Sequence, residues 1–183
     1  MAAPTPVEPV KLFVAILWTD AESLTAACAQ MSPRWGAIDF TGPDHPFDVT
    51  DYYVGEMGTH LQRRLVAFEP LMQPEVLPAA KLFCNQVEVD LSGPAGRRVN
   101  LDIGYLDHNK VVLASAKGAG QKIYLAQGIY ADLVGRYAEG RYQPFAWTFP
   151  DFKAGRYDAE LATIRRRYME QLRQKRHVST SRS

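Results

Sequence analysis

A continuous run of seven apolar residues, at positions 12–18, constrains the fold more than any other feature of the sequence. The run is too short to cross a bilayer, which takes about 20 residues. It is typical of a strand that is buried on both faces of a sheet. After it, residues 21–31 carry apolar side chains at helical spacing up to Ser32-Pro33, and residues 37–40 predict a second strand. The chain therefore opens β-α-β.

The remaining sequence predicts further strands and two more helices. A helix is expected over residues 74–86, and a last helix begins near Arg156 or Asp158. From Val87 the apolar period changes to two, which predicts a hairpin of residues 87–91 and 98–106 around a turn at 92–96. Strands follow at 111–116, 123–125, 129–137 and 142–147. Residues 47–68 combine signals of strand and helix and are interpreted as mostly extended, with a helix as the alternative.

These elements predict an α+β fold: a single domain with a mixed or largely antiparallel sheet and about three helices. The expected boundaries are a flexible N-terminal segment at 1–10, the domain at 11–174 and a disordered basic tail at 175–183. The 183 residues suit one domain. Without a signal-like segment, and with Cys28 and Cys84 far apart, the sequence favours a cytoplasmic protein with reduced thiols and no membrane span.

The charge is unevenly distributed along the chain. Overall it is +1, which excludes a generally polybasic coat, but residues 165–183 hold seven basic residues and one acidic residue, a net charge of +6. Such asymmetry can indicate contact with RNA or an acidic protein. The alternative is a solvated helix end, whose cations complement the helix dipole. The residues in question are Arg165, Arg166, Arg167, Arg173, Lys175 and Arg176.

Standard motifs for nucleotides, hydrolysis and metals are missing. The sequence has no G-x-x-x-x-G-K-[ST], no G-x-G-x-x-G after the first strand and no G-x-S-x-G. Its four histidines lack the spacing of a transition-metal site. No metal is therefore predicted, and the cofactor, the oligomeric state and whether the protein is an enzyme stay open.

Polar residues nevertheless recur where strands and their ends are expected. On a strand, Arg98, Asn100, Asp102 and Gly104 share one face, which can read a polar ligand; the alternative is a salt-bridge ladder with Glu88 and Asp90. Lys117 and Lys122 flank two glycines in a loop that can cradle a phosphate; the alternative is an ordinary hairpin turn.

The ligand is expected to be anionic or phosphorylated, such as a nucleotide. Carboxylates at Glu56, Asp102 and Glu88 are candidates for orienting it or for acid–base chemistry. The candidate binding residues are Arg98, Asn100, Gly104, Tyr105, Lys117, Lys122, Lys81, Asn85 and Tyr53. The rival hypothesis is a non-catalytic module that binds RNA or protein through the basic C-terminal helix.

Several sequence blocks occur together in a fixed order. They are Asp51-Tyr-Tyr-x-x-Glu-Met-Gly58, Lys81 with Asn85 and Glu88, Arg98-Val-Asn-Leu-Asp-x-Gly-Tyr-Leu106, Lys110-Val-Val-Leu-Ala-Ser-x-Lys117, Ile123-Tyr-Leu125, Gly128-Ile-Tyr-Ala131 and Trp147-Thr-Phe-Pro-Asp-Phe152. As a set they resemble a bacterial family known only as domain of unknown function 4416. Some members bear the label "GTP-binding protein", which the resemblance extends to this chain as an expectation.

The chain departs from the pattern of that family at two places. The family tends to show Asp-Pro-Gly-Tyr where this chain has Asp102-Ile-Gly104-Tyr105, and His-Arg where it has Gln121-Lys122. The resemblance therefore implies a cation at position 122 but no imidazole at position 121.

Overall fold

The structure is a computed structural model that describes residues 3–94 and 96–180. Its described strands form one antiparallel sheet in the order β2-β4-β1-β5-β6-β8-β7, with β3 paired to β4 and β9 to β8. The strands are β1 (Val10–Trp18), β2 (Ile38–Thr41), β3 (His45–Pro46), β4 (Gln62–Met72), β5 (Val99–Leu106), β6 (Lys110–Ser115), β7 (Ile123–Ala126), β8 (Ile129–Ala138) and β9 (Arg141–Pro144).

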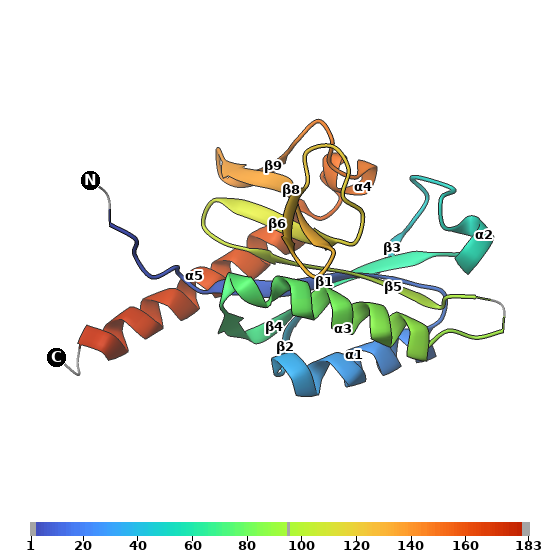
Figure 1. The fold of residues 1–183 in the computed structure, drawn as a ribbon, viewed down its shortest axis with the longest axis horizontal. Helices are drawn as coiled ribbons and strands as arrows, with labels where there is room; N and C mark the ends of the chain where they lie inside the picture. The colour runs from blue at the N-terminus through green and yellow to red at the C-terminus, as the bar shows by residue number, and fades with distance from the viewer. Residues whose placement is uncertain (1–2, 95, 181–183) are drawn as a thin grey trace.

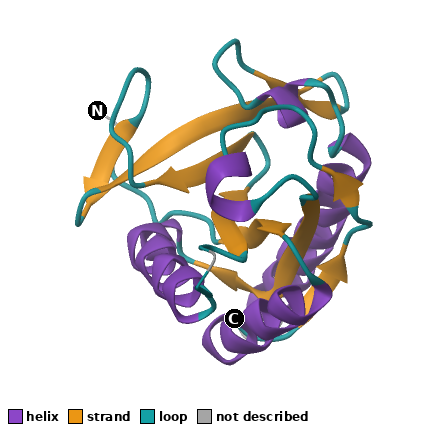
Figure 2. Cartoon of the chain, turned by 90° about the vertical axis from the view of Figure 1, so that its right-hand side faces the viewer, coloured by secondary structure: helices purple, strands orange, loops and turns teal. Residues whose placement is uncertain are grey.

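The helices lie on both sides of this sheet, as Figures 1 and 2 show. They are α1 (Ala21–Trp35), α2 (Val54–Met57), the 3-10 turn η1 (Pro74–Val76), α3 (Leu77–Asp90), α4 (Pro150–Lys153) and α5 (Asp158–Thr180). The α+β class, the opening β-α-β and the antiparallel sheet predicted from the sequence are confirmed. Of the six helical segments within residues 3–94 and 96–180, three are long: α1, α3 and α5.

Strand β1 is central, as its apolar run predicts. It pairs with β4 on one side and β5 on the other, and its residues Leu12 to Leu17 are fully buried. Leu12, Val14 and Ile16 belong to a core that α1 and α3 cover. Phe13 and Ala15 face a second core on the opposite side, which α5 covers with Ile164, Tyr168 and Leu172. Burial on both faces explains why the run shows no alternation.

Helix α1 continues through Pro33 to Trp35, beyond the end that the sequence predicts at Ser32-Pro33. Proline inside a helix costs a hydrogen bond and introduces a steric clash. Trp35 opposes this cost because it is almost fully buried and packs edge-on against Phe68 and Phe83, with ring centroids 5.1 and 5.4 Å away. Tertiary packing therefore extends the helix past the proline.

The predicted hairpin of residues 87–91 and 98–106 is wrong in its first arm. Residues 87–90 are the last turn of α3, and only the second arm is a strand, β5. Val87 and Glu88 are both buried while Val89 is 66% exposed, so the true pattern is helical. The buried charge of Glu88 resembled the polar face of a strand, which produced the apparent period of two. The segment 47–68, predicted as mostly extended, is likewise mixed: α2 lies within it and β4 begins only at Gln62.

The two ends of the domain differ in structure, because one is irregular and the other is helical. Residues 3–9 precede β1 without regular secondary structure. Helix α5 continues to Thr180, so residues 175–180 of the expected basic tail are helical, and residues 181–183 lie outside the described part of the chain. No helix within the described ranges has the length and apolar character that a bilayer span requires.

Strands β5 and β6 separate after a short ladder. Strand β5 pairs with β1 from Val99 to Leu106, but its described pairing with β6 covers only Gly104 to Leu106. At Gly104 the two backbones are in close contact, since a Cβ atom there would lie 2.2 Å from the carbonyl oxygen of Val112. Gly104, a predicted ligand residue, therefore lies at the point from which the strands diverge.

This close contact makes a prediction about Gly104. The substitution Gly104→Ala should lower the free energy of unfolding by about 1–3 kcal/mol, because backbone atoms must move to admit the methyl group. Urea denaturation followed by circular dichroism measures the change.

Gly55→Ala provides the control, because no atom lies within 4 Å of the added Cβ and the residue is helical. It should be neutral or slightly stabilising. Equal stability of the two variants would contradict the close-contact account of Gly104.

Candidate functional site

The gap between β5 and β6 opens into a cavity of about 520 Å³. Beyond the last pair of the ladder, Asn100 and Asp102 form the β5 wall, and residues 113–117 form the β6 wall. The remaining lining comes from α3, β4 and β8, from the loop between β3 and α2, from residues 149–151, and from Arg97 and Lys122. The charged lining residues are Arg63, Lys81, Glu88, Arg97, Asp102, Lys117, Lys122, Asp132 and Asp151.

Helix α3 supplies the hydrogen bonds that β6 does not make with β5. The Leu101 N–H donates to Glu88 Oε1 at 2.7 Å, and the Leu101 carbonyl accepts from Lys81 Nζ at 2.8 Å. Lys81 and Glu88 also form an ion pair at 3.6 Å, and both are more than nine-tenths buried. A buried backbone without partners would be costly. The two side chains thus satisfy the backbone of Leu101 at a point where β6 does not pair with β5.

Arg97 links this pair to the rim of the cavity. Its guanidinium donates to Glu88 Oε2 and to Asn100 Oδ1, both at 2.9 Å, and forms a bidentate pair with Glu56. Burial alone would lower the pKa of Arg97, but its hydrogen bonds to the carboxylates of Glu56 and Glu88 outweigh that effect and raise the pKa. The amide of Asn100 is therefore fixed, with its oxygen on Arg97.

A buried arginine, Arg63, organises the opposite part of the cavity. Arg63, on β4, donates to Asp102 at 3.0 Å and to Asp151 at 2.7 Å, and its guanidinium lies 4.6 Å from the centre of the Phe47 ring. Burial would lower the pKa of Arg63, but the charges of Asp102 and Asp151 raise it above its ordinary value. The Tyr157 hydroxyl donates to Asp151 at 2.8 Å and completes the network.

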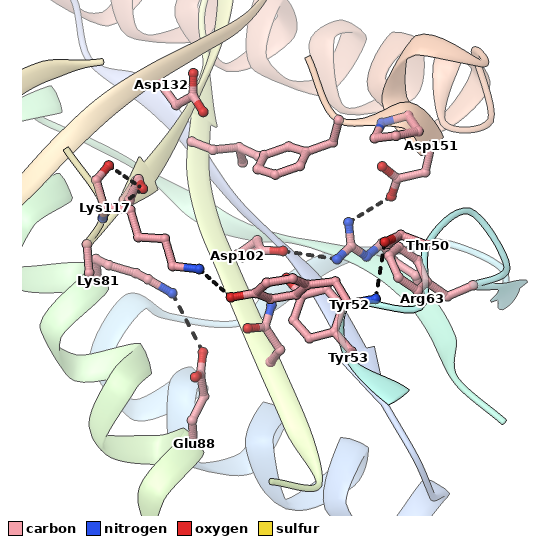
Figure 3. Close-up of a pocket in the computed structure, with 18 of the residues that line it drawn as sticks. Thr50, Tyr52, Tyr53, Arg63, Lys81, Glu88, Asp102, Lys117, Asp132 and Asp151 are labelled. Carbon is pink, nitrogen blue, oxygen red and sulfur yellow. Dashed lines mark hydrogen bonds and ion pairs between the residues drawn. The ribbon is translucent and has the colours of Figure 1, made fainter. Parts of the chain in front are cut away.

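The loop after β6 brings the two predicted lysines to the cavity. Lys117 Nζ donates to the Tyr52 hydroxyl and lies 4.6 Å from the centre of that ring. Lys122 Nζ donates to Ser115 Oγ at 2.9 Å and lies 3.7 Å from Asp132 Oδ2. Figure 3 shows Lys81 and Lys117 reaching inward from the side opposite Tyr52, Tyr53 and Arg63. Burial raises the pKa of Tyr53, which keeps this phenol neutral.

Most residues that the sequence singled out converge on this cavity. Eight of the twelve line it: Tyr53, Lys81, Asn85, Glu88, Asn100, Asp102, Lys117 and Lys122. Glu56 lies outside the lining and reaches the site only through Arg97. Gly104 packs against β6, and Tyr105 packs against the core under α1 and α3.

Arg98 does not share the cavity face of Asn100 and Asp102. It precedes β5, and its guanidinium pairs with Asp20 at 2.8 Å and Glu22 at 3.2 Å, at the start of α1. The expected alternation therefore holds only from Val99, where the strand begins. The cation that meets Asn100 is the preceding residue, Arg97.

Four charged residues of the site were not singled out from the sequence: Arg63, Arg97, Asp132 and Asp151. Both Arg63 and Asp132 are buried. Asp132 interrupts the apolar segment of β8, and a charge in such a segment requires a buried partner, which is the signal that could have identified it. Arg63 lies between Gln62 and Arg64 at the polar start of β4 and gives no such signal. Asp151 lies within the block Trp147–Phe152, whose chemical role the sequence pattern alone does not reveal.

The carboxylates proposed for acid–base chemistry all have ion-pair partners. Glu88 pairs with Lys81 and Arg97, Asp102 with Arg63, and Glu56 with Arg97. Through these contacts each carboxylate holds a cationic side chain of the site in position. Among residues 3–94 and 96–180, no group of three or more His, Cys, Asp or Glu side chains is placed to hold a metal ion.

The basic residues of α5 lie away from the cavity. Arg165, Arg166 and Arg173 border a separate hollow beside Tyr137, and the Arg165 guanidinium stacks 3.5 Å from the Tyr137 ring centre. Arg167 is exposed, and Arg176 pairs with Glu8. Lys175 is exposed on the same helix. The same helix buries Tyr168 and Leu172 in the core, so it is part of the domain.

The sequence matches one known protein family over most of its length. Residues 8–168 match the family described as Domain of unknown function (DUF4416), which covers most of the 183 residues. The protein therefore belongs to this family. No curated protein matches the chain, and no solved structure does.

The contacts of Glu88 lead to a second prediction. Glu88→Ala should lower the free energy of unfolding by about 3–5 kcal/mol, because it leaves Lys81 and the Leu101 N–H buried without their partner. Urea denaturation of the purified variant tests this.

Asp90→Ala is the matched control, since Asp90 is an exposed acidic residue two positions after Glu88, at the end of α3. It should change stability by less than about 0.5 kcal/mol. A Glu88 variant as stable as this control would show that β5 does not depend on the contact.

Proposed function

We propose that the protein binds an anionic or phosphorylated small molecule, such as a nucleotide, in the cavity between β5 and β6. The observation that carries this proposal is the position of Lys117. It enters a cavity rich in charged groups, and among the described residues it has no carboxylate partner within ion-pair distance. A cation in this setting is available to an anion brought by a ligand.

The other cations of the cavity support this interpretation by contrast. Arg63 lies between two carboxylates, Arg97 between Glu56 and Glu88, and Lys81 beside Glu88. Lys122 has its nearest carboxylate oxygen at 3.7 Å, a looser contact than those of the arginines. The cations of the cavity that are least engaged by carboxylates are therefore Lys117 and Lys122, which follow the end of β6 in the chain.

The size of the cavity is compatible with a small metabolite. Ligand pockets usually measure about 300–1,000 Å³ and combine apolar walls with a few oriented polar groups. Here the apolar wall includes Phe47 and Phe149, and the polar groups include the amide of Asn100. The loop after β6 leads into the strand β7 rather than a helix, so the lysine side chains would hold the anion without a helix dipole.

The site supports binding more directly than proton transfer. The three candidate carboxylates are held in ion pairs, and Asp102 shares its arginine with Asp151. We therefore assign these groups to positioning the cations and the β5 wall, and Lys117 and Lys122 to contacting the ligand.

Ligand binding can be tested with Lys117→Gln. Isothermal titration of the wild-type protein with nucleoside monophosphates should show saturable binding that weakens as salt rises. The variant should lose about 10- to 150-fold in affinity, because a charge-assisted hydrogen bond contributes about 1.5–3 kcal/mol. Its thermal unfolding should match the wild type, since Lys117 is exposed.

Lys110→Gln is the matched control, because Lys110 lies at the other end of β6 and pairs with Asp107 outside the cavity. It should leave affinity unchanged. The choice of a nucleotide as the ligand is refuted if wild-type protein binds none of the nucleotides, and the role of Lys117 is refuted if both variants weaken binding to the same degree.

A further inference from the structure

Phe149 stands out among the aromatic residues of the cavity. It lines the cavity, yet it is 40% exposed. Phe47, Tyr52 and Tyr53 also line the cavity, and each makes ring contacts with a neighbour or accepts a cation on its face. Phe149 makes no ring or cation contact of this kind with any described residue.

The backbone around Phe149 is firmly anchored, although its ring is not. On one side, Thr148 is buried, and its hydroxyl donates to the Val134 carbonyl at 2.6 Å. On the other side, Asp151 is held by Arg63, and Phe152 enters the core beneath α5. The ring is therefore presented by a rigid segment. Its exposure is not a consequence of a loosely held loop.

The position of the ring relates it to the cations of the site. Phe149, Lys117 and Lys122 line the same cavity, on segments that are separate in the sequence. A cavity lined by both an apolar ring and cations matches a molecule with one planar group and one anionic group. A sugar phosphate provides the anion but has no planar ring to cover the Phe149 face.

We infer that Phe149 is a stacking surface for an aromatic heterocycle, and that the ligand class is therefore the nucleotides rather than the sugar phosphates. This inference rests on the proposed function, because it assumes that Lys117 and Lys122 hold the phosphate. It assigns recognition of the base to Phe149. Stacking on an aromatic ring discriminates weakly between bases, because every base has a π face.

The experiment compares ligands that differ only in the base. Wild-type protein is titrated calorimetrically with ribose 5-phosphate and with AMP, GMP, CMP and UMP. The nucleotides should bind about 10-fold more tightly than ribose 5-phosphate, the effect of stacking one base on an aromatic side chain.

Phe149→Ala should remove this difference and leave the affinity for ribose 5-phosphate unchanged. Phe149→Trp should restore it, since indole also stacks. Tyr124→Ala is the matched control: Tyr124 is an exposed aromatic residue, 59% accessible, on β7 outside the cavity lining. It should bind all five compounds as the wild type does.

The outcomes separate the two proposals. If ribose 5-phosphate and the nucleotides bind the wild type equally, or if Phe149→Ala weakens both by the same factor, the stacking inference fails and the anion site stands. If no compound binds the wild type, the proposed function fails and the inference fails with it. A thermal unfolding midpoint equal to the wild type for each variant assures that the comparison concerns folded protein.

Discussion

The cavity depends on the two side-chain contacts with the backbone of Leu101. A sheet strand that loses its neighbour leaves N–H and C=O groups without partners, and in a buried place this is costly. Here Glu88 accepts from the Leu101 N–H and Lys81 donates to its carbonyl, so α3 replaces the missing strand. The separation of β5 and β6 is thereby a stable part of the fold. Both walls of the site, and the arginine that fixes Asn100, depend on it.

The charged side chains of the site differ in whether they have a partner of opposite charge. Arg63 and Arg97 each lie between two carboxylates. The buried Arg63 is tolerated away from water because its charge is paired, and the half-buried Arg97 connects the buried Glu88 to the exposed Glu56. Such networks hold side chains in fixed positions, and here they fix the groups around an opening. Lys117 differs from both arginines in lacking such a pair. Because Lys117 has no carboxylate partner among the described residues while the arginines do, it is the cation that makes the cavity a candidate binding site.

The sequence predicts the architecture well and the site in part, for physical reasons. The uninterrupted apolar run identifies β1, and the spacing of Leu161, Ile164, Tyr168 and Leu172 identifies α5, because burial imposes those periods. The period failed at Glu88, whose burial depends on the distant Leu101. For the same reason Arg63 was missed, since its partners Asp102 and Asp151 are remote in sequence. The spacing of apolar residues reflects how one helix or strand is buried. It does not show which charged side chains pair when they are remote in the sequence.

The short ladder between β5 and β6 also has a mechanical meaning. Three residue pairs, Gly104 to Leu106 with Leu113 to Val111, connect the two walls of the cavity at one end. Strand β5 is held by α3 and β1, and strand β6 is held by β8. A molecule that contacts both strands would link them at the end where they are apart. The width of the cavity is then set by the angle at which β5 and β6 diverge, and substitutions near the paired residues can change this angle without altering a residue that contacts the ligand.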